Sequence, residues 1–145
     1  SSAVPAPGVL AALADADVVL LAPSNPVVSI GPILAIPGLA DAVRATSAPV
    51  VGVSPIIAGA VVRGMADACL TAIGVSTSAD AVALHYGVRS AGGVIDGWLV
   101  DTADDAALAP VASAGIRARA VPLWLSDDAT RAQVARDAVE LALSL

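Results

Sequence analysis

Uninterrupted aliphatic runs alternate along the chain with stretches that have helical spacing. A short apolar run without polar interruption is typical of a strand buried on both faces of a sheet. Four such strands are predicted, at residues 17–22, 49–53, 94–100 and within 116–125. Helices are predicted at residues 8–14, 31–45 with a break at 37–38, 63–73, 78–86, 103–114 and after 126. Strands separated by helices predict parallel βαβ units, so the fold class is α/β, with a mostly parallel sheet and helices on both faces.

The final helix shows the clearest pattern. Ser126 is predicted to cap it, and the two aspartates that follow lie in its first turn, where the helix dipole favours negative charge. Val134, Ala138 and Leu141 recur at helical spacing. We therefore expect these three side chains to face the core.

The first predicted strand is followed by a turn whose hydrogen-bonding side chains are Ser24, Asn25 and Ser29. Gly31-Pro32 then open a helix, with Ser29 as the predicted N-cap. The first N–H groups of a helix lack partners within it, so a strand end, a polar turn and a helix N-terminus together form a site for an anion. A well-capped connection that binds nothing accounts for the same residues equally well.

The second predicted strand also ends in a serine and a proline, Ser54-Pro55. In a parallel sheet, ligands bind beyond the carboxyl ends of the strands, at a switch in strand order. If the two strands are neighbours, Ser24, Asn25 and Ser54 line one crevice. Arg63 stands at the start of a predicted helix, where it opposes the helix dipole unless an anion lies beside it; a solvated arginine is the alternative.

Composition narrows the classes of function. The 145 residues make one domain, and because 57% of them are hydrophobic with no Phe, the core must be built from Ala, Val, Leu and Ile. The net charge is -6, with seven basic residues against thirteen acidic ones. No basic stripe exists for a sequence-independent grip on nucleic acid, whereas local phosphate binding through backbone donors and one or two arginines is compatible with this charge.

Residues 18–40 carry no charge and are long enough to span a bilayer. Four prolines within them, at positions 23, 26, 32 and 37, would leave backbone groups unsatisfied in lipid, so we expect no membrane span. Residues 1–7 lack the basic and apolar regions of a signal peptide.

Common catalytic motifs are missing from the sequence. One Cys and one His exclude an internal disulfide and a zinc site of thiolates and imidazoles, and neither G-x-G-x-x-G, Walker A nor G-x-S-x-G occurs. Cys69 is predicted to be a small core residue. Asp96 and Asp101 are candidates for metal binding or base catalysis, although the start of a strand and a turn explain them better. Trp98 and Trp124 are expected in the core, with stacking on a flat ligand as the alternative.

Several ordered motifs resemble one family. They are residues 21–26 (LAPSNP), 29–34 (SIGPIL), 48–57 (APVVGVSPII), 63–67 (RGMAD), 96–100 (DGWLV) and 120–123 (AVPL). Together they resemble the 2-phospho-L-lactate transferase family, in particular the actinobacterial phosphoenolpyruvate transferases of coenzyme F-420 biosynthesis. The resemblance covers nearly the whole chain, and four or more motifs in the same order are far more specific than any one of them.

This resemblance implies a cytoplasmic, Rossmann-like and commonly homodimeric enzyme that uses Mg2+. Such an enzyme transfers a phosphoenolpyruvyl or phospholactyl group from a guanosine diphosphate-linked donor to 7,8-didemethyl-8-hydroxy-5-deazariboflavin, and it releases GMP. Backbone N–H groups at residues 29–31 and the guanidinium of Arg63 are expected to neutralise the phosphate charge. The residues implied to bind the donor or the deazaflavin acceptor are Ser24, Asn25, Pro26, Ser29, Gly31, Pro32, Ser54, Pro55, Ile56 and Arg63.

One departure from the family pattern is large. The family's first strand, its glycine-rich loop and the aspartates thought to hold the metal have no counterpart in this sequence. We therefore expect a C-terminal portion of such an enzyme, a single α/β segment over residues 1–145 that lacks the metal ligands and does not turn over alone. A non-catalytic guanine-nucleotide-binding domain and a purely structural α/β module are the alternatives.

Overall fold

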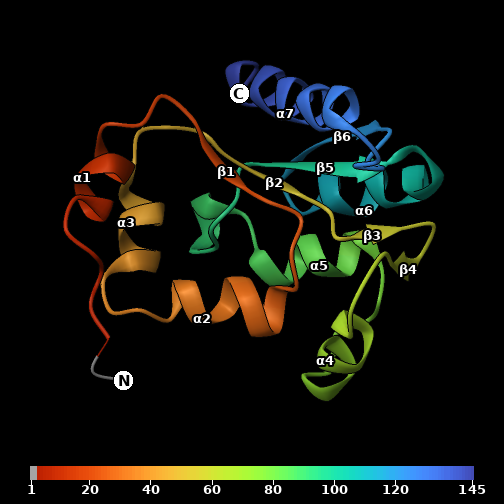
Figure 1. The fold of residues 1–145 in the computed structure, drawn as a ribbon, viewed down its shortest axis with the longest axis horizontal. Helices are drawn as coiled ribbons and strands as arrows, with labels where there is room; N and C mark the ends of the chain where they lie inside the picture. Colours follow the sequence, from red (N-terminus) through yellow and green to blue (C-terminus); the bar gives the residue numbers. More distant parts are fainter. Residues whose placement is uncertain (1–2) are drawn as a thin grey trace.

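The computed structural model describes residues 3–145, so Ser1 and Ser2 of the opening stretch lie outside the described residues. A parallel four-stranded sheet forms the centre, in the order β1 (Val19–Leu21), β2 (Val50–Val53), β5 (Gly97–Asp101) and β6 (Arg117–Val121) (Figure 1). The predicted parallel α/β sheet is confirmed. The described strands follow chain order, so the sheet that they form contains no switch in strand order.

Helical segments connect and cover the strands. They are α1 (Val9–Ala14), η1 (Pro26–Ile30), α2 (Gly31–Leu34), α3 (Leu39–Ala45), α4 (Ala66–Ala72), α5 (Ala79–Tyr86), η2 (Arg89–Ala91), η3 (Thr102–Ala107), α6 (Leu108–Ser113) and α7 (Asp128–Leu143). η1 is a π-helix, and η2 and η3 are 3-10 helices. A small antiparallel hairpin of β3 (Ile56–Ile57) and β4 (Ala60–Val61) was not predicted, because strands of two residues carry no periodic signal.

Helices cover both faces of the sheet. Figure 1 shows α7 above the sheet and α2, α3 and α5 below it. Val51 and Leu99 pack with α7, whereas Val50 and Trp98 pack with the helices of the opposite face. Successive strand residues point to opposite faces, so both sets must be apolar, and the uninterrupted aliphatic runs of the sequence follow from this arrangement.

Trp98 occupies the middle of the larger core cluster. Its ring is fully buried, and its Nε1 donates a hydrogen bond to the carbonyl oxygen of Ala79 at 3.0 Å. Gly52 lies opposite Trp98 on the neighbouring strand, and a Cβ at Gly52 would overlap the ring. Trp98 is therefore the core residue that the sequence predicts, and its bulk requires glycine at position 52.

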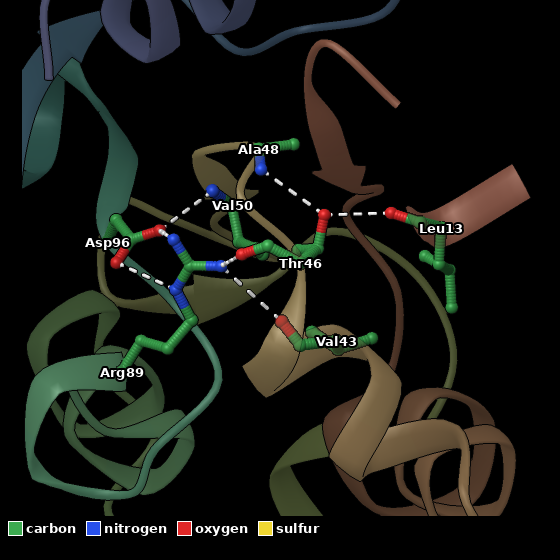
Figure 2. Close-up of polar contacts among 7 residues, drawn as sticks. All are labelled: Leu13, Val43, Thr46, Ala48, Val50, Arg89 and Asp96. Atoms are coloured by element: carbon green, nitrogen blue, oxygen red, sulfur yellow. Dashed lines mark hydrogen bonds and ion pairs between the residues drawn. The ribbon is translucent and has the colours of Figure 1, made fainter. Parts of the chain in front are cut away.

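A polar cluster joins the segments at the amino ends of the strands (Figure 2). This amino-end clasp consists of Thr46, Arg89 and Asp96. The Arg89 guanidinium lies 2.8 and 3.1 Å from the two carboxylate oxygens of Asp96 and donates to the carbonyl oxygen of Thr46 at 2.7 Å. Asp96 also accepts the Val50 N–H at 2.9 Å, and the Thr46 hydroxyl donates to the carbonyl oxygen of Leu13 at 2.7 Å. The prediction that Asp96 shapes the start of a strand is confirmed.

Two helix starts differ from the prediction. α4 begins at Ala66, so Arg63 precedes the helix instead of opening it. α7 is capped by Asp127 and not by Ser126, since the Asp127 carboxylate accepts the Thr130 N–H at 2.8 Å while the Thr130 hydroxyl accepts the Asp127 N–H at 3.1 Å. This reciprocal capping box moves the cap by one residue. The hydrogen bonds from Thr130 also lower the pKa of Asp127.

The apolar stretch at residues 18–40 is divided among β1, η1, α2 and the start of α3. Within residues 3–145 no single helix is long and apolar enough to cross a membrane. The segments Pro26–Leu34 and Leu39–Ala45 reach the required length and composition only together, and they are bent by 82° relative to each other.

A candidate binding groove at the carboxyl ends of the strands

A groove of about 880 Å³ lies beyond the carboxyl ends of β1 and β2, and we name it the carboxyl-end groove. Its lining comes from the segments that follow β1, β2 and β6, from the end of the β3–β4 hairpin and from α7. The lining residues are Pro23, Ser24, Asn25, Ser29, Ser54, Pro55, Ile57, Val62, Arg63, Ala66, Leu123, Trp124, Leu125, Ser126 and Arg131. Because β1 and β2 are hydrogen-bonded neighbours, their carboxyl ends meet, and the predicted crevice of Ser24, Asn25 and Ser54 is formed.

The backbone amides after Asn25 do not form the predicted anion site. The Asn25 side-chain oxygen accepts the N–H groups of Val27 and Val28 at 2.9 and 3.2 Å. The Asn25 carbonyl oxygen accepts those of Ser29 and Ile30, both at 3.1 Å, as the chain winds into the π-helix. Asn25, and not Ser29, is therefore the N-cap, and the donors expected to bind phosphate are already used within the segment.

The hydroxyls of Ser24 and Ser29 differ from those amides. Both serines are half-buried in the groove wall, and within residues 3–145 neither hydroxyl has a hydrogen-bond partner. Each hydroxyl can both donate and accept a hydrogen bond. These two side chains are thus the polar groups of the first turn that are free to meet a ligand.

Three other predicted site residues of this segment lie away from the groove lining. Pro26 is the buried first residue of η1, and Pro32 is exposed in the first turn of α2. A Cβ at Gly31 would come within 2.9 Å of the Pro26 carbonyl oxygen, so glycine lets the π-helix pass directly into α2. Pro26 and Gly31 therefore shape the segment that presents Ser24 and Ser29.

Ser54 lines the groove, but its hydroxyl is used in a local turn. The hydroxyl accepts the Ile56 N–H at 3.1 Å and donates to the Ile56 carbonyl oxygen at 3.0 Å, and the residue is only 2% exposed. This turn holds Pro55 at the groove wall. Ile56 is fully buried in the core instead of contacting the groove, and the next residue, Ile57, lines it.

The β3–β4 hairpin connects Ser54 and Pro55 on one side of the groove lining to Val62 and Arg63 on the other. Its two-residue turn has positive φ at both positions, 53° at Ala58 and 70° at Gly59. The carboxylate of Asp104, which lies in η3, accepts both turn amides, at 2.8 Å from Ala58 and 2.7 Å from Gly59. An isolated two-stranded hairpin is marginally stable, so this contact fixes the hairpin on the body of the domain.

The charged lining residues are both arginines. Arg63 is exposed and has neither an ion pair nor a hydrogen bond with any of residues 3–145. Arg131 pairs with Asp128 one helical turn away, at 2.7 Å. No carboxylate occurs among the described lining residues, so the groove favours an anionic ligand.

Sequence reasoning missed the wall formed by the segment between β6 and α7. Trp124, Leu125 and Ser126 line the groove there, together with Arg131 of α7. Trp124 is 58% exposed, and the expectation of a core residue is wrong because β6 ends at Val121, before the tryptophan. The sequence contained the information needed to predict this wall, because the segment follows the carboxyl end of a parallel strand, just as Ser24 and Ser54 do.

The residues that the structure describes do not fit a resident metal ion. In that part of the chain no group of three or more His, Cys, Asp or Glu side chains is placed to hold one. Asp101 accepts the N–H groups of Ala103 and Leu123 at 2.9 and 2.8 Å, which confirms its predicted turn role. Cys69, predicted in the core, is only half-buried in α4.

Together, the fold and the groove define an α/β protein with an arginine-lined groove at the carboxyl ends of its parallel strands. Comparison with known sequences identifies the family within this class. Residues 1–136 match the family described as 2-phospho-L-lactate transferase CofD. The chain therefore belongs to that family of transferases, and the predicted resemblance is confirmed.

Three relatives with high sequence identity carry the name phosphoenolpyruvate transferase. The protein of Kitasatospora aureofaciens is 61% identical over 141 residues, which are 97% of this chain and 43% of that protein. That of Thermobifida fusca (strain YX) is 60% identical over 144 residues, or 99% of this chain and 42% of the relative. That of Mycobacterium sp. (strain KMS) is 57% identical over 137 residues, which are 94% of this chain and 40% of that relative. The chain thus spans about two fifths of the length of the curated relatives it matches.

Proposed function

We propose that this chain is part of an enzyme of coenzyme F-420 biosynthesis that transfers a phosphoenolpyruvyl group, or a phospholactyl group, to a deazaflavin. The donor is a guanosine diphosphate-linked molecule, the acceptor is 7,8-didemethyl-8-hydroxy-5-deazariboflavin, and the product that leaves is GMP. The family membership and the name of the relatives support a transferase of this kind.

One observation supports the proposal that this part of the protein binds the substrates. The carboxyl-end groove combines the unpaired guanidinium of Arg63, a second arginine and the two free serine hydroxyls, with no carboxylate among its described lining residues. Arginines and hydroxyls bind phosphate oxygens through charge-assisted hydrogen bonds. Such a groove suits the diphosphate of the donor and the single phosphate of the GMP that leaves.

The proposed reaction is an in-line displacement at the β-phosphorus of the donor. The terminal ribityl hydroxyl of the acceptor forms a new O–P bond, the bond between the β-phosphorus and the bridging oxygen breaks, and GMP leaves with that electron pair. The hydroxyl proton is lost to a base that is not among the groove-lining residues. Phosphoryl transfer depends mostly on positioning and charge neutralisation, which are the contributions available from Arg63, Ser24 and Ser29.

Further parts of the proposal concern the whole protein. We propose that Mg2+ assists the reaction and that its ligands come from the part of the relatives' length that this chain does not cover. We also propose a homodimer that works in the cytoplasm, without nucleic acid or membrane as a partner.

The test is a calorimetric titration of the chain with guanosine diphosphate. Arg63→Gln is expected to weaken binding about tenfold, because a charged hydrogen bond to phosphate contributes about 1.5–3 kcal/mol. Arg117→Gln is the matched control, since the Arg117 side chain is also exposed and has no hydrogen bond or ion pair within residues 3–145, but Arg117 lies at the amino end of β6. Equal affinity in wild type and Arg63→Gln, or equal losses in both variants, would contradict the proposed site.

A further inference from the structure

The two tryptophans of the chain lie in opposite environments. Trp98 is fully buried, contacts the Tyr86 ring at a centroid distance of 5.7 Å and has its Nε1 bonded to Ala79. Trp124 is 58% exposed, and within residues 3–145 it has neither a ring contact nor a hydrogen bond. Its large apolar surface and its N–H group are therefore both available in the carboxyl-end groove.

The backbone on the amino side of Trp124 is held firmly. The Leu123 N–H donates to the buried carboxylate of Asp101 at 2.8 Å, and the Leu123 side chain is 4% exposed in the cluster beneath α7. On the other side, the capping box of Asp127 and Thr130 fixes the start of α7. A ring presented from a segment anchored at both ends acts as a platform, because little conformational freedom remains to be lost on binding.

The groove around this ring is amphipathic. Val62 and Leu125 are exposed apolar residues of its lining, and Arg63 and Arg131 are its cations. An apolar ring surface beside guanidinium groups suits a ligand that carries a planar ring at one end and negative charge at the other.

We propose that Trp124 is the stacking surface for the planar fused heteroaromatic ring of a substrate that binds in the carboxyl-end groove. The inference rests on the proposed function, in which the guanine of the donor and the deazaflavin of the acceptor are both such rings. Stacking of a base on an aromatic side chain contributes about 1–3 kcal/mol, which makes Trp124 a specificity residue that prefers ring-bearing ligands over a bare diphosphate.

The experiment measures three dissociation constants by calorimetry on the chain, for guanosine diphosphate, for the deazaflavin acceptor and for inorganic pyrophosphate. Trp124→Leu is expected to weaken the ring-bearing ligand about tenfold or more and to leave pyrophosphate within about twofold. Trp124→Phe, which keeps an aromatic face, is expected to restore most of the affinity. Leu84→Ala removes exposed apolar surface from α5, outside the groove lining, and serves as the matched control, with a change below about threefold expected.

Tryptophan emission provides an independent readout. Binding of guanosine diphosphate to a stacked Trp124 quenches part of the wild-type emission, and the quenching is lost in Trp124→Phe, in which the buried Trp98 is the remaining emitter. Affinity loss for the nucleotide alone assigns Trp124 to the donor, and loss for the deazaflavin alone assigns it to the acceptor; either result supports stacking.

Failure of the inference and failure of the proposed function give different results. Equal affinity of wild type and Trp124→Leu for the ring-bearing ligands overturns the stacking role and leaves the transferase proposal intact. A folded wild-type chain that binds none of the three probes contradicts both the stacking role and the assignment of the groove as the binding site. A loss of pyrophosphate affinity as large as that of the ring-bearing ligands, with an unchanged urea unfolding midpoint, also overturns stacking, because the effect then concerns phosphate and not the ring.

Discussion

The two ends of the central sheet use the same kinds of side chain in opposite ways. In the amino-end clasp, Arg89 bonds to both oxygens of Asp96 and to the Thr46 carbonyl, and Asp96 also accepts the Val50 N–H (Figure 2). In the carboxyl-end groove, Arg63 has no partner within residues 3–145. A side chain whose hydrogen-bonding capacity is used within the chain holds the fold together, whereas one that is left free is available to a ligand.

Asn25 shows that position in the groove alone does not decide between these uses. It lines the groove, yet its side-chain oxygen is used by the amides of Val27 and Val28. Replacing Asn25 therefore disturbs the segment that carries the groove serines, and a kinetic effect of that change would not separate binding from local folding. Arg63 and Trp124 are better probes because replacing their side chains breaks no hydrogen bond, ion pair or ring contact among the described residues.

The largest expected effect is at the amino-end clasp. Asp96→Ala leaves the Arg89 guanidinium without its partner and the Val50 N–H without an acceptor, so we expect the free energy of unfolding to fall by about 3 kcal/mol. Urea unfolding measures this loss. Asp105→Ala, at an exposed aspartate, is the control and is expected to stay within about 0.5 kcal/mol of wild type. An equal midpoint for wild type and Asp96→Ala would show that the clasp is not structural.

An intermediate effect is expected at the hairpin that presents Arg63. Asp104→Asn replaces one acceptor oxygen by a donor, so only one of the Ala58 and Gly59 amides keeps its bond, with a local loss of about 1–2 kcal/mol. Hydrogen exchange at these two amides is expected to accelerate, and guanosine diphosphate affinity is expected to fall, while the urea midpoint changes little. Asp105→Asn is the control. Unchanged exchange at both amides would mean that Asp104 does not hold the hairpin.

The smallest effect is expected at the helix start beside the groove. The Thr130 hydrogen bonds lower the pKa of Asp127, so its stabilisation of α7 is present above the ordinary carboxyl pKa and is lost as the pH falls through the lowered value. Asp127→Asn is expected to lower the thermal midpoint slightly at pH 7, with the difference from wild type vanishing in strong acid. A difference that persists in acid would contradict the charged cap as its cause.

Much of the fold and part of the site followed from local sequence pattern. Aliphatic runs identified the four strands of the parallel sheet, and serine at the ends of β1 and β2 predicted the shared crevice. The pattern failed for Ser29 as an N-cap, and Ile56, which only the family resemblance implied as a binding residue, lies in the core and not in the groove lining. Local hydrogen bonds decided both positions. The π-helix begins after Asn25, so Asn25 is the N-cap, and the Ser54 hydroxyl bonds to the backbone of Ile56.

The sequence by itself determined the alternation of buried strands and helices, because a strand covered on both faces requires a continuous apolar run that is visible in any short window. Only the tertiary structure decided which polar groups are used and which are free. Asp104 meets the hairpin turn 46 residues away, and Asp96 meets Val50 across the same separation. Such contacts depend on how the elements pack and leave no periodic trace in the chain. For the same reason the exposure of Trp124 and the burial of Trp98 became visible only in the folded protein.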